Sequence, residues 1–97
     1  MVLKTTKFDI QDHLKTLEDQ IAYLEAAVDE DDPSFIATAL GDIAKARGIS
    51  KFAEEAGLSR ETIYKSFRPG GNPTIETVNK ATRALGLKLK LTPAKAA

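Results

Sequence analysis

Residues 49–67 have the sequence Ile-Ser-Lys-Phe-Ala-Glu-Glu-Ala-Gly-Leu-Ser-Arg-Glu-Thr-Ile-Tyr-Lys-Ser-Phe, and this stretch decides the fold. Apolar residues in its first half recur at the spacing of a helix with one buried face, at Ile49, Phe52, Ala53 and Ala56. A second apolar pair four residues apart, Ile63 and Phe67, indicates a second helix. The stretch therefore predicts two short helices separated by a tight turn at residues 57–59.

The turn has the residues that such a bend requires. Gly57 follows the last periodic residue of the first helix, where a left-handed backbone conformation suits glycine. Ser59 is expected to cap the second helix and Ser50 the first, each by accepting a hydrogen bond from a backbone N–H group. Ala53 is small where the two helices should cross. These features predict a helix-turn-helix, and an ordinary helical hairpin is the alternative.

The exposed face of this motif carries groups that fit a DNA duplex. A recognition helix presents its N-terminal residues to base edges in the major groove, where Arg60 suits guanine, Glu61 suits cytosine and the Thr62 methyl group suits thymine. Cations and hydroxyl groups at helix starts and in loops suit phosphate. The candidate DNA-binding residues are Ser50, Lys51, Ser59, Arg60, Glu61, Thr62, Tyr64, Lys65, Arg68, Asn72 and Thr74.

For each of these side chains the alternative is an ordinary solvated surface. The positive end of a helix dipole favours Glu61 at its position without any DNA. Tyr64 alternatively covers the edge of the core.

Charge is distributed unevenly along a chain that is neutral as a whole, with 14 basic and 14 acidic residues. Residues 1–48 hold five basic and ten acidic residues, a net charge of −5, whereas residues 49–97 hold nine basic and four acidic residues, a net charge of +5. The basic half suits a phosphate surface. The acidic half should face away from DNA and attract a basic partner, unless this asymmetry has no function.

The N-terminal segment carries an apolar seam in steps of four and three residues, at Ile10, Leu14, Leu17, Ile21, Leu24 and Val28. The seam fits one long helix, or two helices broken near Lys15 and Thr16 with Thr16 as the second cap. It is expected to pack on its own domain, on a partner or on a second copy.

Residues 29–32 are all acidic, but they lack the alternating spacing of a calcium loop, so a solvated turn is expected. Asp32 and Pro33 predict the cap and first residue of the next helix. Gly48 should end it, and its inward residues should be Ile36, Ala39, Leu40 and Ile43.

The chain after the predicted motif should form a loop, a helix and a strand. Residues 68–73 have a loop composition, Thr74 should cap a helix, and Gly86 should end it. The inward residues of that helix should be Ile75, Val78, Ala81, Thr82 and Leu85. Residues 87–91 alternate leucine and lysine, which predicts a short strand at residues 87–92 that pairs with its copy in a second subunit. A frayed tail is the alternative.

The whole composition fits one small domain, residues 1–97, divided into an N-terminal helical extension (1–31), a helix-turn-helix core (33–86) and the strand. The chain has no cysteine for a disulfide or thiolate metal site. It shows no signal peptide or membrane-spanning run, so we expect a soluble, cytoplasmic protein. The single histidine, His13, has no evident catalytic partner, so we expect no enzyme activity, metal or cofactor.

The chain resembles the antidote (antitoxin) proteins of bacterial addiction modules, specifically a HigA-like family with a lambda Cro-type helix-turn-helix. The resemblance covers nearly the whole sequence, and its most specific motifs are Ala-Leu-Gly-Asp-Ile-Ala at residues 39–44, Gly-Leu-Ser-Arg-Glu at 57–61 and Gly-Asn-Pro at 71–73. Other matching residues are Phe8-Asp9, Tyr23-Leu24-Glu25-Ala26-Ala27, Asp32-Pro33 and residues 84–89. The general motif has an apolar residue near position 66, whereas this chain has Ser66 before Phe67, which predicts a rotated or shortened recognition helix.

This resemblance implies an all-α, five-helix, lambda-repressor-like domain. It also implies a homodimer that represses its own operon, and a RelE/ParE-like toxin as partner of a type II toxin–antitoxin module. A stand-alone transcription regulator without a toxin and a module that binds only protein are the alternatives. The identity of the neighbouring gene would distinguish the first, and a gel shift with the upstream DNA would distinguish the second.

Overall fold

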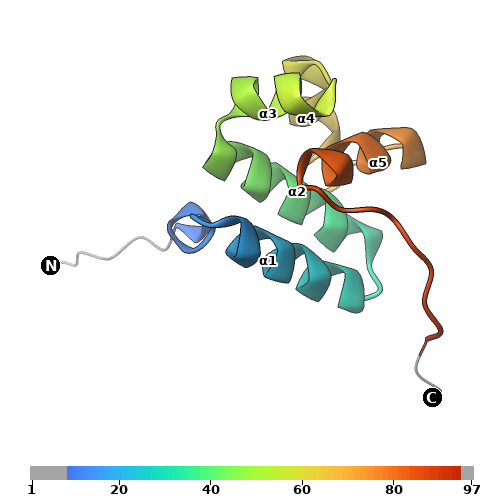
Figure 1. Ribbon diagram of the computed structural model, residues 1–97. Coiled ribbons are helices and arrows are strands. Elements are labelled where there is room, and N and C mark those ends of the chain that lie inside the picture. Colours follow the sequence, from blue (N-terminus) through green and yellow to red (C-terminus); the bar gives the residue numbers. More distant parts are fainter. Residues whose placement is uncertain (1–8, 95–97) are drawn as a thin grey trace, which may run out of the picture.

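The computed structural model describes residues 9–94, which form five α-helices preceded by a short 3-10 helix (Figure 1). The elements are η1 (Ile10–His13), α1 (Leu17–Asp29), α2 (Pro33–Arg47), α3 (Ile49–Ala56), α4 (Arg60–Ser66) and α5 (Ile75–Ala84). The prediction of an all-α chain with five helices is confirmed. No helix in residues 9–94 is both long and apolar enough to cross a bilayer.

Most helices begin at the polar caps that the sequence predicted. The Asp32 carboxylate accepts a hydrogen bond from the Ser34 N–H at 3.0 Å, and Pro33 is the first residue of α2. The Thr74 hydroxyl accepts from the Thr77 N–H at 3.1 Å at the start of α5. These caps satisfy backbone N–H groups that lack an acceptor within the helix.

The predicted cap at Ser50 is wrong. α3 begins one residue earlier, at Ile49, so Ser50 lies inside its first turn and Gly48 occupies the cap position with φ 96°. No side chain caps this helix. Gly48 is both the C-cap of α2 and the N-cap of α3, so no separate polar residue can occupy the N-cap position of α3.

The N-terminal extension consists of two helices rather than one. η1 ends at His13, and the Thr16 hydroxyl then caps α1 by accepting from the Asp19 N–H at 3.0 Å. Of the predicted seam, Leu14 and Leu24 are buried in the core, whereas Leu17 and Val28 are exposed. The break rotates the second half of the seam, so only part of it packs on the domain.

α2 is the central helix of the domain. It contacts η1, α1, α3 and α4, and it lies between α1 and the α3–α4 end of the molecule in Figure 1. Its fully buried residues include Leu40 and Ile43, as predicted, together with Ala37 and Ala44. A Cβ atom at Gly41 would overlap the carbonyl oxygen of Phe67, so α2 and the end of α4 approach each other closely.

The predicted strand at residues 87–92 is not seen, because the structure has no strand within residues 9–94. Its predicted partner was the same segment of a second subunit, and no helix of the described residues supplies a backbone to pair with it. Leu87 packs against the core, while Leu91 is 99% exposed. The inward placement of Ile75 is also wrong: this first residue of α5 is 77% exposed. The other predicted inward residues of α5 are at least partly buried.

Replacing Gly41 by alanine should destabilise the protein, although alanine is the better helix former. The added methyl group overlaps the backbone of Phe67, and overpacking of this kind costs about 1–3 kcal/mol. Urea unfolding followed by circular dichroism measures the change. Lys45→Ala is the control, because Lys45 is an exposed residue of the same helix, where an alanine meets no backbone overlap. A Gly41→Ala variant as stable as the parent would contradict the close approach.

A tyrosine that joins α1 to α2 should make stability depend on alkaline pH. The Tyr23 hydroxyl donates to Asp42 at 2.6 Å, and burial, the hydrogen bond and the charge of Asp42 raise the pKa of Tyr23 from 10.0 to about 12. Between these values the unfolded chain releases the proton while the folded chain keeps it, so stability falls as pH rises. The fall should be smaller for Tyr23→Phe, as urea unfolding at several alkaline pH values measures. Equal slopes in the two proteins would contradict this assignment.

Candidate nucleic-acid interface

α3 and α4, together with their connecting turn, form a two-helix segment at one end of the molecule (Figure 1). We call residues 49–66 the α3–α4 segment. Phe52 and Ala53 from α3 and Ile63 from α4 are buried in the core, and Leu58 in the turn packs against it. Because one side of each helix is buried in this way, the opposite side is turned outward.

The turn itself has the geometry that the sequence predicted. Gly57 has φ 70° and ψ 34°, the left-handed conformation that ends a helix, and the Leu58 N–H donates to the Ala53 carbonyl at 2.9 Å. The Ser59 hydroxyl oxygen accepts from the Thr62 N–H at 3.0 Å and lies 2.8 Å from the Thr62 hydroxyl. These bonds start α4 directly after the bend and fix the orientation of its first turn.

The predicted base-contacting side chains lie together on α4. Arg60, Glu61, Tyr64 and Lys65 are exposed, whereas Thr62 is half-buried and its hydroxyl is engaged by Ser59. α4 ends at Ser66, and Phe67 turns into the core. α4 therefore covers seven residues, Arg60–Ser66, and Phe67 is its C-cap.

The basic side chains of this surface are not neutralised within the described chain. The ion pairs among residues 9–94 are Arg47 with Glu55 and Lys80 with Glu76. Lys51, Arg60 and Lys65 therefore have no carboxylate partner in that range. Such cations remain available to an external anion.

The candidate phosphate contacts flank α4. Ser50 and Lys51 are exposed in the first turn of α3, where no side chain occupies the backbone N–H groups. Exposed Arg68 donates through Nε to the Lys65 carbonyl at 3.1 Å, which ties it to the end of α4. A Cβ at Gly71 would overlap the Ser66 carbonyl oxygen, so the loop that carries Asn72 passes against that same end.

Thr74 is the candidate with the clearest structural role. Its hydroxyl caps α5 and lies 3.0 Å from the Thr77 hydroxyl. Asn72 and Thr74 are both exposed, but they lie in the loop that precedes α5 rather than in the α3–α4 segment.

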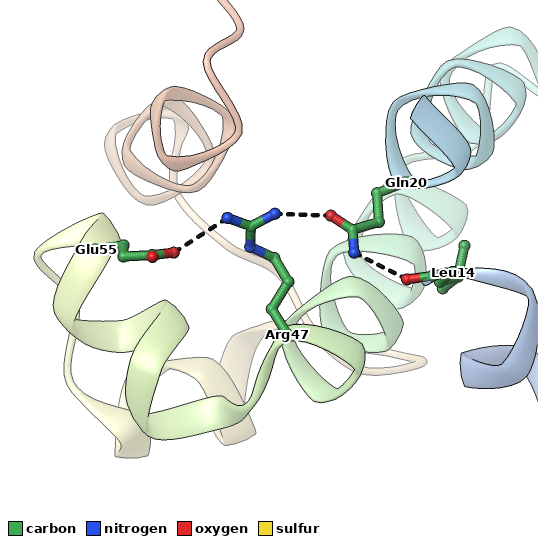
Figure 2. A network of polar contacts seen from close by, with 4 residues as sticks. All are labelled: Leu14, Gln20, Arg47 and Glu55. Carbon is green, nitrogen blue, oxygen red and sulfur yellow. Dashed lines mark hydrogen bonds and ion pairs between the residues drawn. The ribbon is translucent and has the colours of Figure 1, made fainter. Parts of the chain in front are cut away.

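A partly buried polar network that the sequence did not reveal links α3 to the N-terminal extension (Figure 2). Arg47, at the end of α2, donates to the Gln20 side-chain oxygen at 2.8 Å and to Glu55 on α3 at 3.2 Å. Gln20, in turn, donates to the Leu14 carbonyl at 2.8 Å. The Nε atom of Arg47 is buried with no partner among the described residues. The network joins three separate parts of the chain around one guanidinium group.

No metal-binding group is formed by the described residues, in which no three His, Asp or Glu side chains cluster suitably. His13 lies in the last turn of η1, away from the α3–α4 segment in the chain. The candidate site is therefore a surface of cations, carboxylates, hydroxyl groups and one aromatic ring on two short helices.

These features define the chain as a small all-α protein with an exposed two-helix segment that carries three cations and three carboxylates. The model of the family described as "Probable addiction module antidote protein" matches residues 4–93, so the chain belongs to that family. An uncharacterized protein of Haemophilus influenzae (strain Rd KW20) is 44% identical over 84 residues, which are 87% of each chain. No solved structure matches significantly. The family supports an addiction-module antitoxin with a toxin partner, whereas the HigA-like and Cro-type details stay predictions.

Removing the central amide of the network should destabilise the protein. Gln20→Leu leaves the Leu14 carbonyl and an Arg47 N–H without their partners, and each unsatisfied buried group costs about 1–3 kcal/mol. Thermal and urea unfolding measure the loss. Gln11→Leu is the control, because the Gln11 side chain makes no hydrogen bond within residues 9–94. Equal stability of Gln20→Leu and the parent would show that the network contributes nothing.

Proposed function

We propose that this chain is the DNA-binding antitoxin of a type II toxin–antitoxin module, which represses its own operon and neutralises a RelE/ParE-like toxin. The observation that carries the DNA-binding part is the outward face of α4, where exposed cations follow a fixed, Ser59-capped bend. In this proposal the α3–α4 segment is a helix-turn-helix and α4 is its recognition helix.

The first turn of α4 would contact base edges in the major groove. Arg60 is exposed and unpaired by any described carboxylate, which suits bidentate hydrogen bonding to guanine. Glu61 would accept from a cytosine amino group. The hydroxyl of Thr62 is engaged by Ser59, so its methyl group is the part left for a thymine contact. Ser59 would then act mainly by holding the turn.

The flanking groups would position the protein on the sugar–phosphate backbone. The start of α3 has backbone N–H groups without a side-chain cap, beside the Ser50 hydroxyl and the Lys51 ammonium group. Helix starts of this kind bind phosphate well. Lys65, Arg68 and Asn72 would contact the backbone beyond the other end of α4. Such charge-based contacts make affinity fall steeply as salt rises.

A homodimer would place two recognition helices in successive major grooves, about 34–36 Å apart on a near-palindromic operator. Support for self-association comes from a groove of about 1000 Å³ between the end of α1, α5 and residues 87–92. Its apolar residues include the exposed Val28, Ile75 and Leu91. Acidic Glu25 and Asp29 line the same groove as basic Lys88 and Lys90, so two copies of this surface are complementary in charge.

Arg60→Ala should reduce the preference for the operator over random DNA substantially, because a bidentate base contact contributes about 1–3 kcal/mol of discrimination. Lys51→Ala should weaken binding to both DNAs alike and reduce the salt slope by about one. Fluorescence anisotropy with the DNA upstream of the chain's own gene, and with a scrambled duplex, measures both effects. Lys15→Ala, outside the α3–α4 segment, should bind as the parent does.

Two results would overturn parts of this proposal. An Arg60→Ala variant with unchanged discrimination would show that α4 does not enter the groove as proposed. If the parent protein gives no complex with the upstream DNA even at low salt, the DNA-binding function itself is wrong.

A further inference from the structure

A second, smaller groove lies between α1 and α2, in the acidic half of the chain. It encloses about 330 Å³ and is lined by residues of these two helices alone, among them Tyr23, Ala26, Glu30, Phe35, Thr38 and Ala39. We call it the α1–α2 groove. Alanine and threonine side chains make its walls low, so a side chain from another molecule has room to enter between the helices.

Phe35 is the residue that makes this groove unusual. Its ring lines the groove, and the residue is 47% exposed. Phe52 and Phe67, by contrast, are buried in the core. An exposed aromatic ring beside a small apolar pocket is the arrangement found where proteins anchor one another. The sequence pattern of α2 did not single out Phe35, because it lies beside the predicted inward stripe.

The charges around the groove are acidic on both helices. Asp19 and Glu30 lie in the same stripe of α1 as Tyr23 and Ala26, at helical spacing, and Asp42 is held at the groove by the Tyr23 hydroxyl at 2.6 Å. None of these three carboxylates forms an ion pair within residues 9–94. Lys45, three residues after Asp42, is the nearest cation along α2.

The helix dipole reinforces this acidic character at one end. α1 ends at Asp29 with Glu30 as its C-cap, and no basic residue lies in its last turn. The final carbonyl groups of a helix carry partial negative charge and attract cations. Glu30 lines the groove at this point, so the carboxylate and the helix end act together.

We propose that the α1–α2 groove is the docking site for a basic amphipathic segment of the toxin. One apolar side chain of that segment would lie over Ala26 beside the Phe35 ring, and flanking lysine or arginine side chains would pair with Glu30 and Asp42. Glu30 in the lining and Asp42 beside Tyr23 repel a second copy of the same surface and repel nucleic acid, which leaves a basic protein as the matching occupant. This inference rests on the proposed function, from which it takes the existence of a toxin.

The test measures binding of the purified product of the gene adjacent to this chain's own gene, by isothermal titration at low salt. Phe35→Ala and Ala26→Arg should each raise the dissociation constant by a factor of about ten or more, because they truncate or block the anchor. Leu17→Ala is the matched control, since Leu17 has the same 47% exposure but lies outside the groove. It should change binding less than about twofold. Each variant should keep the parent's melting temperature and its affinity for the upstream DNA.

Each remaining outcome has a distinct meaning. If the parent chain does not bind the neighbouring gene product, the antitoxin part of the proposed function fails, and this inference fails with it. If the parent binds but Phe35→Ala and Ala26→Arg bind equally well, the proposed function stands and the groove is not the docking site. If Ala26→Arg instead breaks self-association in sedimentation velocity, the groove holds a second copy and the inference is overturned.

Discussion

The close approach of α2 to the end of α4 is the constraint on which the rest of the structure depends. Gly41 has no side chain where the Phe67 backbone passes, and the Phe67 ring is buried in the core beyond it. α2 also contacts η1, α1 and α3, while α5 contacts α3. α2 therefore positions η1, α1, α3 and α4 directly and α5 through α3, and the outward direction of α4 is set by how tightly its last turn sits on α2.

The guanidinium group of Arg47 adds orientation rather than a large amount of stability. Burying a charge costs desolvation energy, which its hydrogen bonds and ion pair only partly return, and its Nε atom has no partner in the described chain. Gln20 and Glu55 nevertheless receive its N–H groups in directions that a purely apolar contact would not specify. These bonds link Gln20 on α1, through Arg47 on α2, to Glu55 on α3, so they connect the acidic extension to the α3–α4 segment.

Local chemistry explains which features the sequence could predict. The caps at Thr16, Asp32, Ser59 and Thr74 and the bend at Gly57 depend on residues within a few positions of one another, and all of them are present. The strand at residues 87–92 depended on a distant partner that the alternation of leucine and lysine does not supply. Arg47 and Phe35 were missed for the same reason: the role of each follows from a neighbouring helix rather than from its own sequence context. The face of α4 was predictable as a surface, whereas its DNA contacts remain a proposal.

The neutrality of the whole chain has a consequence for how the two proposed surfaces would work together. A net charge of zero gives no general attraction to DNA, so association would depend on presenting the basic half while the acidic half points away. Glu30 of the α1–α2 groove is the C-cap of α1, and α1 lies on the other side of α2 from the α3–α4 segment in Figure 1. A basic partner there would cancel charge that otherwise repels phosphate without covering α4. Because the two surfaces are separate, a basic partner bound at the α1–α2 groove would strengthen the electrostatic attraction of the α3–α4 segment to DNA.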